Sequence, residues 1–304
     1  MGKKIVAFGE VVWDILPNKK ILGGTPLNMV FRSNSFNDKG FLLSRVGDDM
    51  LGAAALERLK DLKIADENVQ IDSEFPTGTV NITLNDNKEA IFHVTPDVAF
   101  DHIEFSSESL KLVRNADCFF YGLLPQRFGL SKNTLRELLN ETPDSIHFLD
   151  LKLFEHFFDV TVVEYLLNFS DIVRIKEKDI LFLSQKLHLN AQNTEQFSEG
   201  LLKKYNLGTV LITRGSNGIA GFNKHAGAFC DPGYNIIAVD NIGSGIAFCA
   251  GFLHYHLNGF PISDAIKFGN AAGALNTTKR GAIAFFGKKD VLDFMEKTPQ
   301  RPKA

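Results

Sequence analysis

The sequence predicts an α/β protein built on a doubly wound, mainly parallel sheet. Short apolar runs typical of buried strands alternate along the chain with segments that have the apolar spacing of amphipathic helices. The runs expected as strands are 4–8, 41–46, 117–122, 146–151, 171–175 and 209–213. The segments expected as helices are 50–62, 130–140, 158–169 and 194–206. Repeated strand–helix–strand order implies right-handed crossovers, which place helices on both faces of the sheet.

The segment 67–95 departs from this order. Its runs "TVNITL" (79–84) and "AIFHV" (90–94) alternate apolar and polar residues, and the turn-forming stretch "NDNKE" (85–89) separates them. This pattern predicts an antiparallel hairpin. Such a hairpin forms either an edge of the sheet or a flap over a ligand site, and alternation alone leaves both open.

The length and the charge balance favour a protein that acts on small molecules. The 304 residues are enough for one large α/β domain or two smaller ones with a substantial core. A formal net charge of −3 gives no overall field that would attract nucleic acid or an acidic membrane. We therefore expect a small-molecule partner, and neither nucleic acid nor membrane.

The cysteines and the apolar runs indicate a cytoplasmic protein. Cys118, Cys230 and Cys249 are odd in number, far apart and without metal-ligand spacing, which fits a reducing compartment. The stretch "MGKKIVAFGEVVWD" lacks the features of a signal peptide. The chain also has no run of about 18 apolar residues, so no membrane-spanning segment is expected.

Asp14 is the first candidate ligand-binding residue. It follows the first predicted strand, near the place where a doubly wound sheet holds its ligand. Its carboxylate only accepts hydrogen bonds and could take two from sugar hydroxyl groups. An aspartate shortly before Pro17 could equally stabilise a turn.

The stretch "GGTPLN" (23–28) combines two glycines with an amide one turn into a predicted helix. Gly23 and Gly24 would let a ligand approach the backbone, and Asn28 could both donate to and accept from a hydroxyl. A plain helix start with a solvent-facing Asn28 is the alternative.

Two further stretches could bind phosphate. "ITRGSNG" (212–218) places Thr213, Gly215 and Gly218 in a turn at a strand end, where backbone N–H groups can surround phosphates, although most such turns bind nothing. "VDNIGSGIAF" (239–248) places Gly243, Ser244 and Gly245 before a predicted helix, whose N-terminal amides and dipole favour an anion. Neither the GxGxxG nor the Walker pattern is present.

These stretches, taken in chain order, resemble the ribokinase-like (PfkB) carbohydrate kinases, and among them the fructokinases most. The resemblance covers nearly the whole chain. It rests on "GEVVWDILP" (9–17), "GGTPLN", "SRVGDDMLG" (44–52), "PTGTV" (76–80), "ITRGSNG", "DNIGSG" (240–245) and "GNAAGALNTTKRGA" (269–282).

The resemblance implies one ribokinase-like α/β domain over 1–304, with a small β-sheet lid formed by about 10–20 and 67–97. It implies ATP-dependent phosphoryl transfer to a primary hydroxyl of a sugar, with Mg²⁺ as cofactor and in many members a monovalent cation. Because lid strands have open edges, it also makes a homodimer through the lid plausible.

The resemblance also implies roles for single residues. The sugar site would contain Asp14, Gly23, Gly24 and Asn28; the nucleotide site Thr213, Gly215, Gly218 and Asn270; the anion hole Gly243, Ser244 and Gly245; and Asp240 would hold the monovalent cation.

The chain departs from the family pattern where the chemistry occurs. The family loop reads D-T-x-G-A-G-D, and its last Asp is the general base; here that position is Ile246. Loss of a general base costs about 10²–10⁴ in rate. In the stretch that resembles D-x-N-x-R, Lys152 replaces the Asn and Phe154 replaces the Arg. In the stretch that resembles N-x-x-E, Lys176 replaces the Asn and Asp179 replaces the metal-organising Glu. Asp179 could still hold a Mg²⁺-bound water, and Lys176 could either contact phosphate or simply be solvated.

Three hypotheses follow. In the first, the chain is an active sugar kinase that uses another acid as its base, with Asp14 or Asp240 as candidates. In the second, it is a homologue that binds sugar or nucleotide with weak or no turnover, as a regulator would. In the third, it is a scaffold that keeps only the fold. The retained binding residues count against the scaffold, and Ile246 counts against full activity. We expect an impaired fructokinase-like kinase, with the inactive regulator as the alternative.

Overall fold

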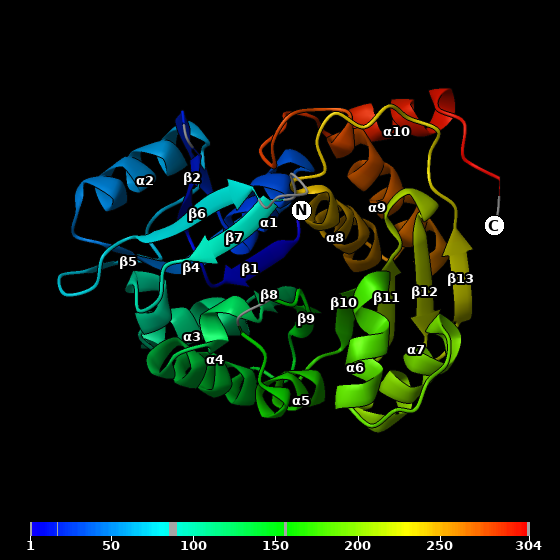
Figure 1. Cartoon of the computed structure of the whole chain (residues 1–304), viewed down its shortest axis with the longest axis horizontal. Coiled ribbons are helices and arrows are strands. Elements are labelled where there is room, and N and C mark those ends of the chain that lie inside the picture. Colours follow the sequence, from blue (N-terminus) through cyan, green and yellow to red (C-terminus); the bar gives the residue numbers. More distant parts are fainter. Residues whose placement is uncertain (1, 17, 85–89, 155–156, 303–304) are drawn as a thin grey trace.

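The computed structural model describes residues 2–16, 18–84, 90–154 and 157–302. Within them, a large sheet has the strand order β13-β12-β11-β10-β9-β8-β1-β4-β5 (Figure 1). Its strands are β1 (Lys4–Phe8), β4 (Lys39–Gly47), β5 (Val69–Asp72), β8 (Cys118–Gly122), β9 (Ile146–Asp150), β10 (Ile172–Lys176), β11 (Thr209–Thr213), β12 (Ile219–Asn223) and β13 (Gly227–Asp231). Neighbouring strands pair in parallel from β5 to β11, and only β11-β12-β13 pair antiparallel. The predicted mainly parallel sheet is confirmed.

Helices cover both faces of this sheet, as the predicted doubly wound fold requires (Figure 1). Strand β1 illustrates why, since Ile5 and Ala7 pack into one core cluster while Val6 and Phe8 pack into another. On the first face lie α1 (Thr25–Ser35), α2 (Met50–Asp61), α8 (Ser244–Leu257), α9 (Ile262–Thr277) and α10 (Lys288–Lys297). On the second lie α3 (Ser107–Arg114), α4 (Gly129–Glu141), α5 (Val160–Asn168), α6 (Ile180–Lys186) and α7 (Thr194–Lys204).

A second, smaller sheet has the order β3-β2-β6-β7. Its strands are β2 (Val12–Leu16), β3 (Lys19–Gly23), β6 (Gly78–Leu84) and β7 (Ala90–Val94). β6 and β7 pair antiparallel, which confirms the predicted hairpin, although its turn 85–89 lies outside the described residues. β5, which belongs to the same expected segment, pairs instead with β4 at the edge of the large sheet.

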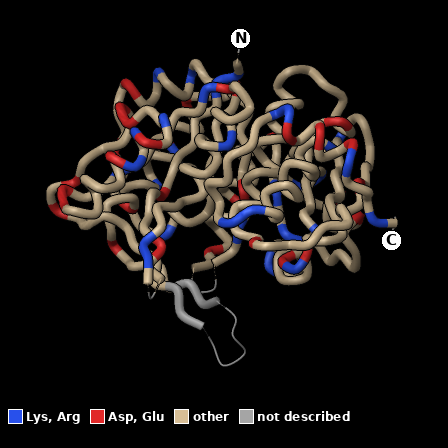
Figure 2. Tube along the Cα trace, turned by 90° about the horizontal axis from the view of Figure 1, so that it is seen from above, with Lys and Arg blue, Asp and Glu red and all other residues tan. Residues whose placement is uncertain are grey.

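Charge is distributed evenly over the chain. Figure 2 shows Lys and Arg interspersed with Asp and Glu along the described trace. None of the helices in the described ranges has the length and apolar character needed to cross a membrane.

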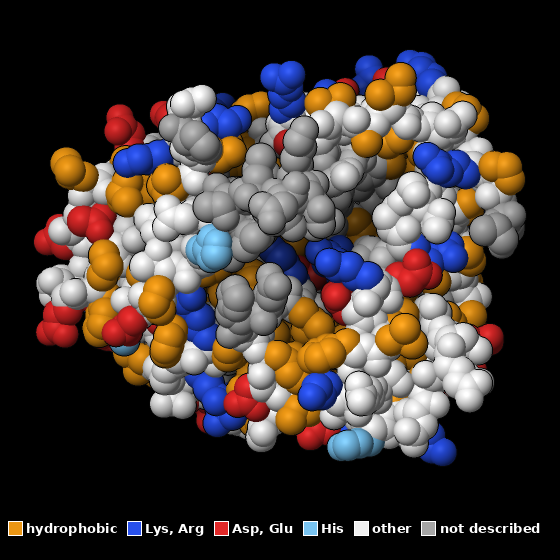
Figure 3. All heavy atoms as spheres, viewed as in Figure 1, with side chains coloured by type: hydrophobic (Ala, Val, Ile, Leu, Met, Phe, Trp, Pro, Cys, Tyr) orange, Lys and Arg blue, Asp and Glu red, His pale blue; other side chains and the backbone are white. Residues whose placement is uncertain are grey.

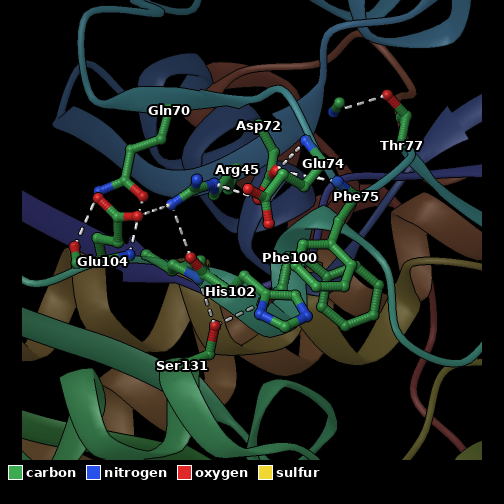
Figure 4. A network of polar contacts seen from close by, with 12 residues as sticks. Arg45, Gln70, Asp72, Glu74, Phe75, Thr77, Phe100, His102, Glu104 and Ser131 are labelled. Carbon is green, nitrogen blue, oxygen red and sulfur yellow. Dashed lines mark hydrogen bonds and ion pairs between the residues drawn. The ribbon is translucent and has the colours of Figure 1, made fainter.

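A polar network fixes the connection from β5 to the second sheet (Figure 4). Arg45 on β4 forms ion pairs with Asp72 at 2.6 Å and with Glu104 at 2.8 Å. The other carboxylate oxygen of Asp72 accepts the backbone N–H groups of Glu74 and Phe75. The end of β5 and the turn after it are therefore held to the large sheet.

Asp49 joins two of the motifs noted in the sequence. As the N-cap of α2 it accepts the N–H of Gly52, and it also accepts the N–H and the hydroxyl of Thr77 just before β6. The Thr77 hydroxyl in turn accepts the N–H of Gly47 at the end of β4. One carboxylate thus connects the large sheet, α2 and the second sheet.

We predict that Asp49→Ala lowers the free energy of unfolding by about 1–3 kcal/mol, because it removes a helix cap and leaves the Thr77 donors without their acceptor. Urea denaturation measures this. Asp48→Ala is the matched control, since Asp48 is exposed and should change stability by less than about 0.5 kcal/mol.

The loss should also depend on pH. Burial opposes ionisation of Asp49, but hydrogen bonds from Thr77 and Gly52 lower its pKa below the ordinary value. Such a carboxylate contributes fully to the free energy of unfolding above the pKa that it has in the unfolded chain. This contribution disappears as the pH falls through the pKa that it has in the folded protein. The difference between the wild type and Asp49→Ala should therefore shrink on acidification; a difference that stays constant in acid would contradict this account.

Candidate active site

The candidate site lies where the carboxyl ends of β9, β10 and β11 meet the first turn of α8. These strands run parallel, so their ends lie at one edge of the sheet. Helix α1, which follows β2 and β3 in the chain, packs against α8, so its start lies in the same region. On the face seen in Figure 3, basic and acidic side chains meet in a hollow near the centre.

The first turn of α8 is built for an anion. Gly243 is the N-cap with a φ of 81°, and a Cβ there would lie 2.5 Å from Cα of Ala282, so only glycine fits. The Ser244 hydroxyl donates to the carbonyl of Asn241. The Gly245 N–H finds no acceptor among the described residues. A free N–H at the positive end of a helix dipole is a suitable donor to a phosphoryl oxygen.

Ile246 directs its side chain into the core. It is 8 % exposed and belongs to the cluster that contains Ala247 and Phe248. Its N–H donates to the carbonyl of Gly243 at 3.1 Å. At this position the chain therefore has packed hydrocarbon and no group that can accept a proton.

A buried ion pair lies directly beneath this turn. Arg174 on β10 donates to Asp150 at the end of β9 at 2.9 Å, and both side chains are at most 6 % exposed. A Cβ on Gly245 would collide with the guanidinium of Arg174. Burial disfavours the charge of Arg174, but Asp150 more than compensates and raises its pKa. A permanent positive charge thus lies against the anion-binding turn.

Lys176 adds a second positive charge at the end of β10, where it pairs with Thr213 of β11. Burial lowers its pKa, and repulsion from Arg174 and Lys152 lowers it further. Such a cation gains free energy when an anion binds beside it. That Lys176 contacts phosphate stays a prediction.

Asp179 follows in a short 3₁₀ turn, Glu177–Asp179. Burial raises the pKa of its carboxyl, while Lys178, Lys176 and Arg174 act in the opposite direction. Over the described ranges no group of three or more His, Cys, Asp or Glu side chains could hold a metal ion. Mg²⁺ often binds through one carboxylate together with substrate phosphates, and Asp179 fits that limited role.

On the sugar side, Asn28 has a buried acceptor without a donor, and Asp14 has a half-buried carboxylate. The Asp14 carboxylate accepts no hydrogen bond from the described chain, and burial raises its pKa, with Lys152 acting against the rise. Oδ1 of Asn28 is buried and likewise lacks a donor. Gly23 lies against Asp14, since a Cβ there would be 3.2 Å from Oδ2. The two acceptors fit hydroxyl groups of a ligand.

Gly24 has a role that the sequence did not indicate. Its φ is 122°, and a Cβ would collide with the backbone carbonyl of Glu10. The glycine is required by the packing of the chain itself. The Glu10 side chain, which is 4 % exposed, accepts the N–H of Thr25 at the start of α1.

The nucleotide turn lies after β11. Gly215 and Gly218 have φ values of 57° and 79°, and a Cβ on Gly218 would collide with the carbonyl of Asp231. Asn270 on α9 is buried, and its amide donates to Asp231 and to the Pro232 carbonyl. Asn270 therefore lies beside this turn, but its donors already hold the end of β13. A cavity of about 450 Å³, lined in part by Asn217 and Pro232, opens next to it.

The carboxylate of Asp240, predicted to hold a monovalent cation, already accepts hydrogen bonds from the chain. One carboxylate oxygen accepts the N–H of Ile242 and the other accepts the N–H of Gly281, each at 2.9 Å. The Ile242 carbonyl accepts the amide of Asn276. Oxygen atoms that would have to coordinate the ion are thus engaged by donors of the chain.

The sequence analysis did not single out Glu10, Asp150 or Arg174. The available signal was a charged residue inside or at the end of an apolar strand, since charged side chains are rarely buried unless paired. The partner of each charge lies on another strand or helix, so the sequence gives no sign of the pair.

Comparison with known proteins identifies the family of this chain. The pfkB family carbohydrate kinases match residues 3–288. A putative sugar kinase of Pyrococcus horikoshii is 26% identical over 292 residues, which are 93% of this chain and 89% of that protein. A fructokinase of Vibrio alginolyticus is 25% identical over 293 residues, which are 90% of this chain and 93% of that protein.

A solved structure has the same fold. A double mutant of a Vibrio cholerae fructokinase, with fructose, ADP and a potassium ion bound, matches with a TM-score of 0.81 and 21% identity over 96% of this chain and 98% of that one. Because the family match extends over nearly the whole sequence, this chain belongs to the pfkB family of carbohydrate kinases.

Proposed function

We propose that this fructokinase-like member of the family binds ATP and a sugar and transfers the γ-phosphoryl group to a primary hydroxyl only slowly. The observation that carries the proposal is the first turn of α8, where a free N–H of Gly245 and the charge of Arg174 adjoin the buried hydrocarbon of Ile246. The turn keeps the means to stabilise phosphoryl charge and lacks a base.

The phosphate chain of ATP would lie between the ends of β10 and β11 and the start of α8. Lys176 and the Gly245 N–H would each contact phosphate oxygens, and Arg174 would add its field from below. Electrostatic stabilisation of this kind is the main contribution of a protein to phosphoryl transfer. A Mg²⁺ ion held by the phosphates and by Asp179 would neutralise further charge when bound.

The sugar would bind between Asp14 and Asn28. Their unsatisfied oxygens accept hydrogen bonds from hydroxyl groups, which orients the ring relative to α8. We further propose that the sheet β3-β2-β6-β7 covers the sugar as a lid, because Asp14 is on β2, next to β6. A homodimer through the edge strands of this sheet stays a prediction.

The missing base limits the rate. The hydroxyl that attacks the phosphorus must lose its proton, and Ile246 cannot accept it. Of the two alternative acids, Asp240 has both oxygens engaged by backbone N–H groups, whereas Asp14 accepts no such bond from the residues that the structure describes. Asp14 is therefore the remaining candidate for residual turnover.

The second candidate function is a sugar- or nucleotide-binding regulator without turnover. The concentration of positive charge around Lys176 favours it, because such a site binds anions without needing to transfer a group. The two functions share their binding residues and differ only in whether ADP is released.

Ile246→Asp should raise sugar-dependent ADP production by about 10²–10⁴, because it supplies a carboxylate at the start of α8. A panel of hexoses and pentoses with a coupled ADP assay measures the rate. Ile246→Asn, which is polar and of similar size but has no basic carboxylate, is the control and should stay as slow as the wild type. Robust activity of the wild type would refute the impaired kinase, and no gain in Ile246→Asp would favour the regulator.

Lys176→Ala should weaken ATP binding by about tenfold or more, because it removes a charged contact to phosphate from a partly buried place. Isothermal titration gives the Kd. Lys178→Ala is the matched control: it removes the same charge two residues away, but Lys178 is exposed and should leave the Kd nearly unchanged. Equal losses in both variants would show that only the general charge matters.

A further inference from the structure

Arg32 on α1 is a buried cation without an acidic partner. It is 1 % exposed and is one of the largest fully buried side chains. In the described part of the chain no carboxylate forms an ion pair with it, while every other arginine with a similarly buried side chain, Arg127 and Arg174, has one. Because burying an uncompensated charge is costly, this guanidinium needs an explanation.

The partners of Arg32 are neutral oxygen atoms. The guanidinium donates to the carbonyls of Ala284 at 2.6 Å and Phe286 at 3.0 Å, to Oδ1 of Asn276 at 3.2 Å and to the Ser35 hydroxyl at 3.3 Å. It also lies 3.5 Å from the centroid of the Phe286 ring. Carbonyl, amide and hydroxyl oxygens are the ligands that a protein offers to a hard metal cation.

These partners belong to the segment that surrounds the anion-binding turn. Asn276, which accepts from Arg32, donates through its amide nitrogen to the Ile242 carbonyl just before Gly243. Ala282 packs against Gly243. It lies in the chain between Gly281, which donates to Asp240, and Ala284, which accepts from Arg32. Arg32 therefore holds the segment after α9 in the position that supports the start of α8.

We propose that the guanidinium of Arg32 is the built-in cation of this site. It binds the carbonyls of Ala284 and Phe286 and positions the anion-binding turn, so that no free monovalent cation is needed. The potassium ion in the related fructokinase structure shows that a cation can accompany this fold. In this chain Asp240 is engaged by Ile242 and Gly281, and the nearby carbonyls by Asn276 and Arg32. Arg32 is a positioning residue, because it acts through Asn276 and the segment it holds.

The wild type gives the first test. Its Tm is measured in potassium, sodium and choline chloride at equal ionic strength, and the Kd for ATP with Mg²⁺ is measured in the same salts. A cation that binds only the native state would raise Tm as its concentration rises. We expect the same Tm in all three salts and ATP affinities that agree within about twofold. A saturable rise of Tm that is specific to potassium or sodium would overturn the proposal.

Arg32→Ala gives the second test, by opening a place for an external cation. Its affinity for ATP should fall by about tenfold, and potassium or a sub-denaturing concentration of guanidinium should restore both affinity and Tm, while choline does not. Arg58→Ala is the control, because Arg58 is an exposed arginine on α2 whose guanidinium pairs with the exposed Asp61. It should behave like the wild type in every salt.

The part of this inference that concerns ATP binding rests on the proposed function. The outcomes of the two tests nevertheless distinguish a failure of one from a failure of the other. A wild type that binds no ATP in any salt would refute the proposed function, and the Tm comparison would still decide the role of Arg32. If Arg32→Ala does not fold, Arg32→Lys keeps the charge with fewer donors and should show partial rescue by potassium. No cation-specific response in a folded Arg32 variant would overturn the proposal.

Discussion

The contact between Gly245 and the guanidinium of Arg174 is the constraint on which the candidate site depends. A Cβ at Gly245 would collide with the guanidinium of Arg174, so a larger residue at this position would force that side chain to move. Arg174 in turn keeps its charge because Asp150 on the adjacent strand accepts its hydrogen bond inside the core. A pair of parallel strands thereby fixes both the position and the electrostatic environment of the first turn of α8.

The site has a cationic half, to which Arg174 belongs, and an acidic half. Arg174 and Lys176 lie on β10, and burial together with mutual repulsion lowers the pKa of Lys176. Glu10 and Asp14 lie on the other side, where burial raises the pKa of both carboxyls and Lys152 acts against the rise. The first half has the charge that suits phosphate and the second the acceptors that suit hydroxyl groups, which is the arrangement that the proposed function requires.

The sequence predicted the architecture well because apolar periodicity depends only on local order. The strands β1, β4, β6, β7 and β8 to β11 and the helices α2, α4, α5 and α7 occur within a few residues of their predicted bounds, whereas β2, β3 and β5 were not predicted as strands. The pairing of β5 with β4 could not be predicted, since sequence alternation does not say which sheet a strand joins. The same holds for Arg32, whose carbonyl partners at Ala284 and Phe286 lie some 250 residues away.

Glycine was the residue type whose role the sequence suggested least completely. Gly24 and Gly218 were expected to admit a ligand, but in each case a Cβ would collide first with the backbone of the chain, at Glu10 and at Asp231. Gly215 is different, because a Cβ there would meet open space. A glycine in a motif therefore indicates close approach of two groups, and only the structure tells whether the second group belongs to the protein or to a ligand.

The departures at Ile246, Lys152 and Lys176 act in the same direction. Relative to the family pattern that the chain resembles, the first removes a negative charge and the other two each add a positive one, while Phe154 removes a positive charge. The buried side chain of Ile246 also adds about 1.5–3 kcal/mol of hydrophobic stabilisation, where a carboxylate would have to be paired or desolvated. Rapid turnover requires tighter binding of the transition state than of substrate or product. Under the proposed function, a more positive, base-free site would bind the phosphorylated ground states more tightly without that discrimination, and ligand would be retained rather than converted.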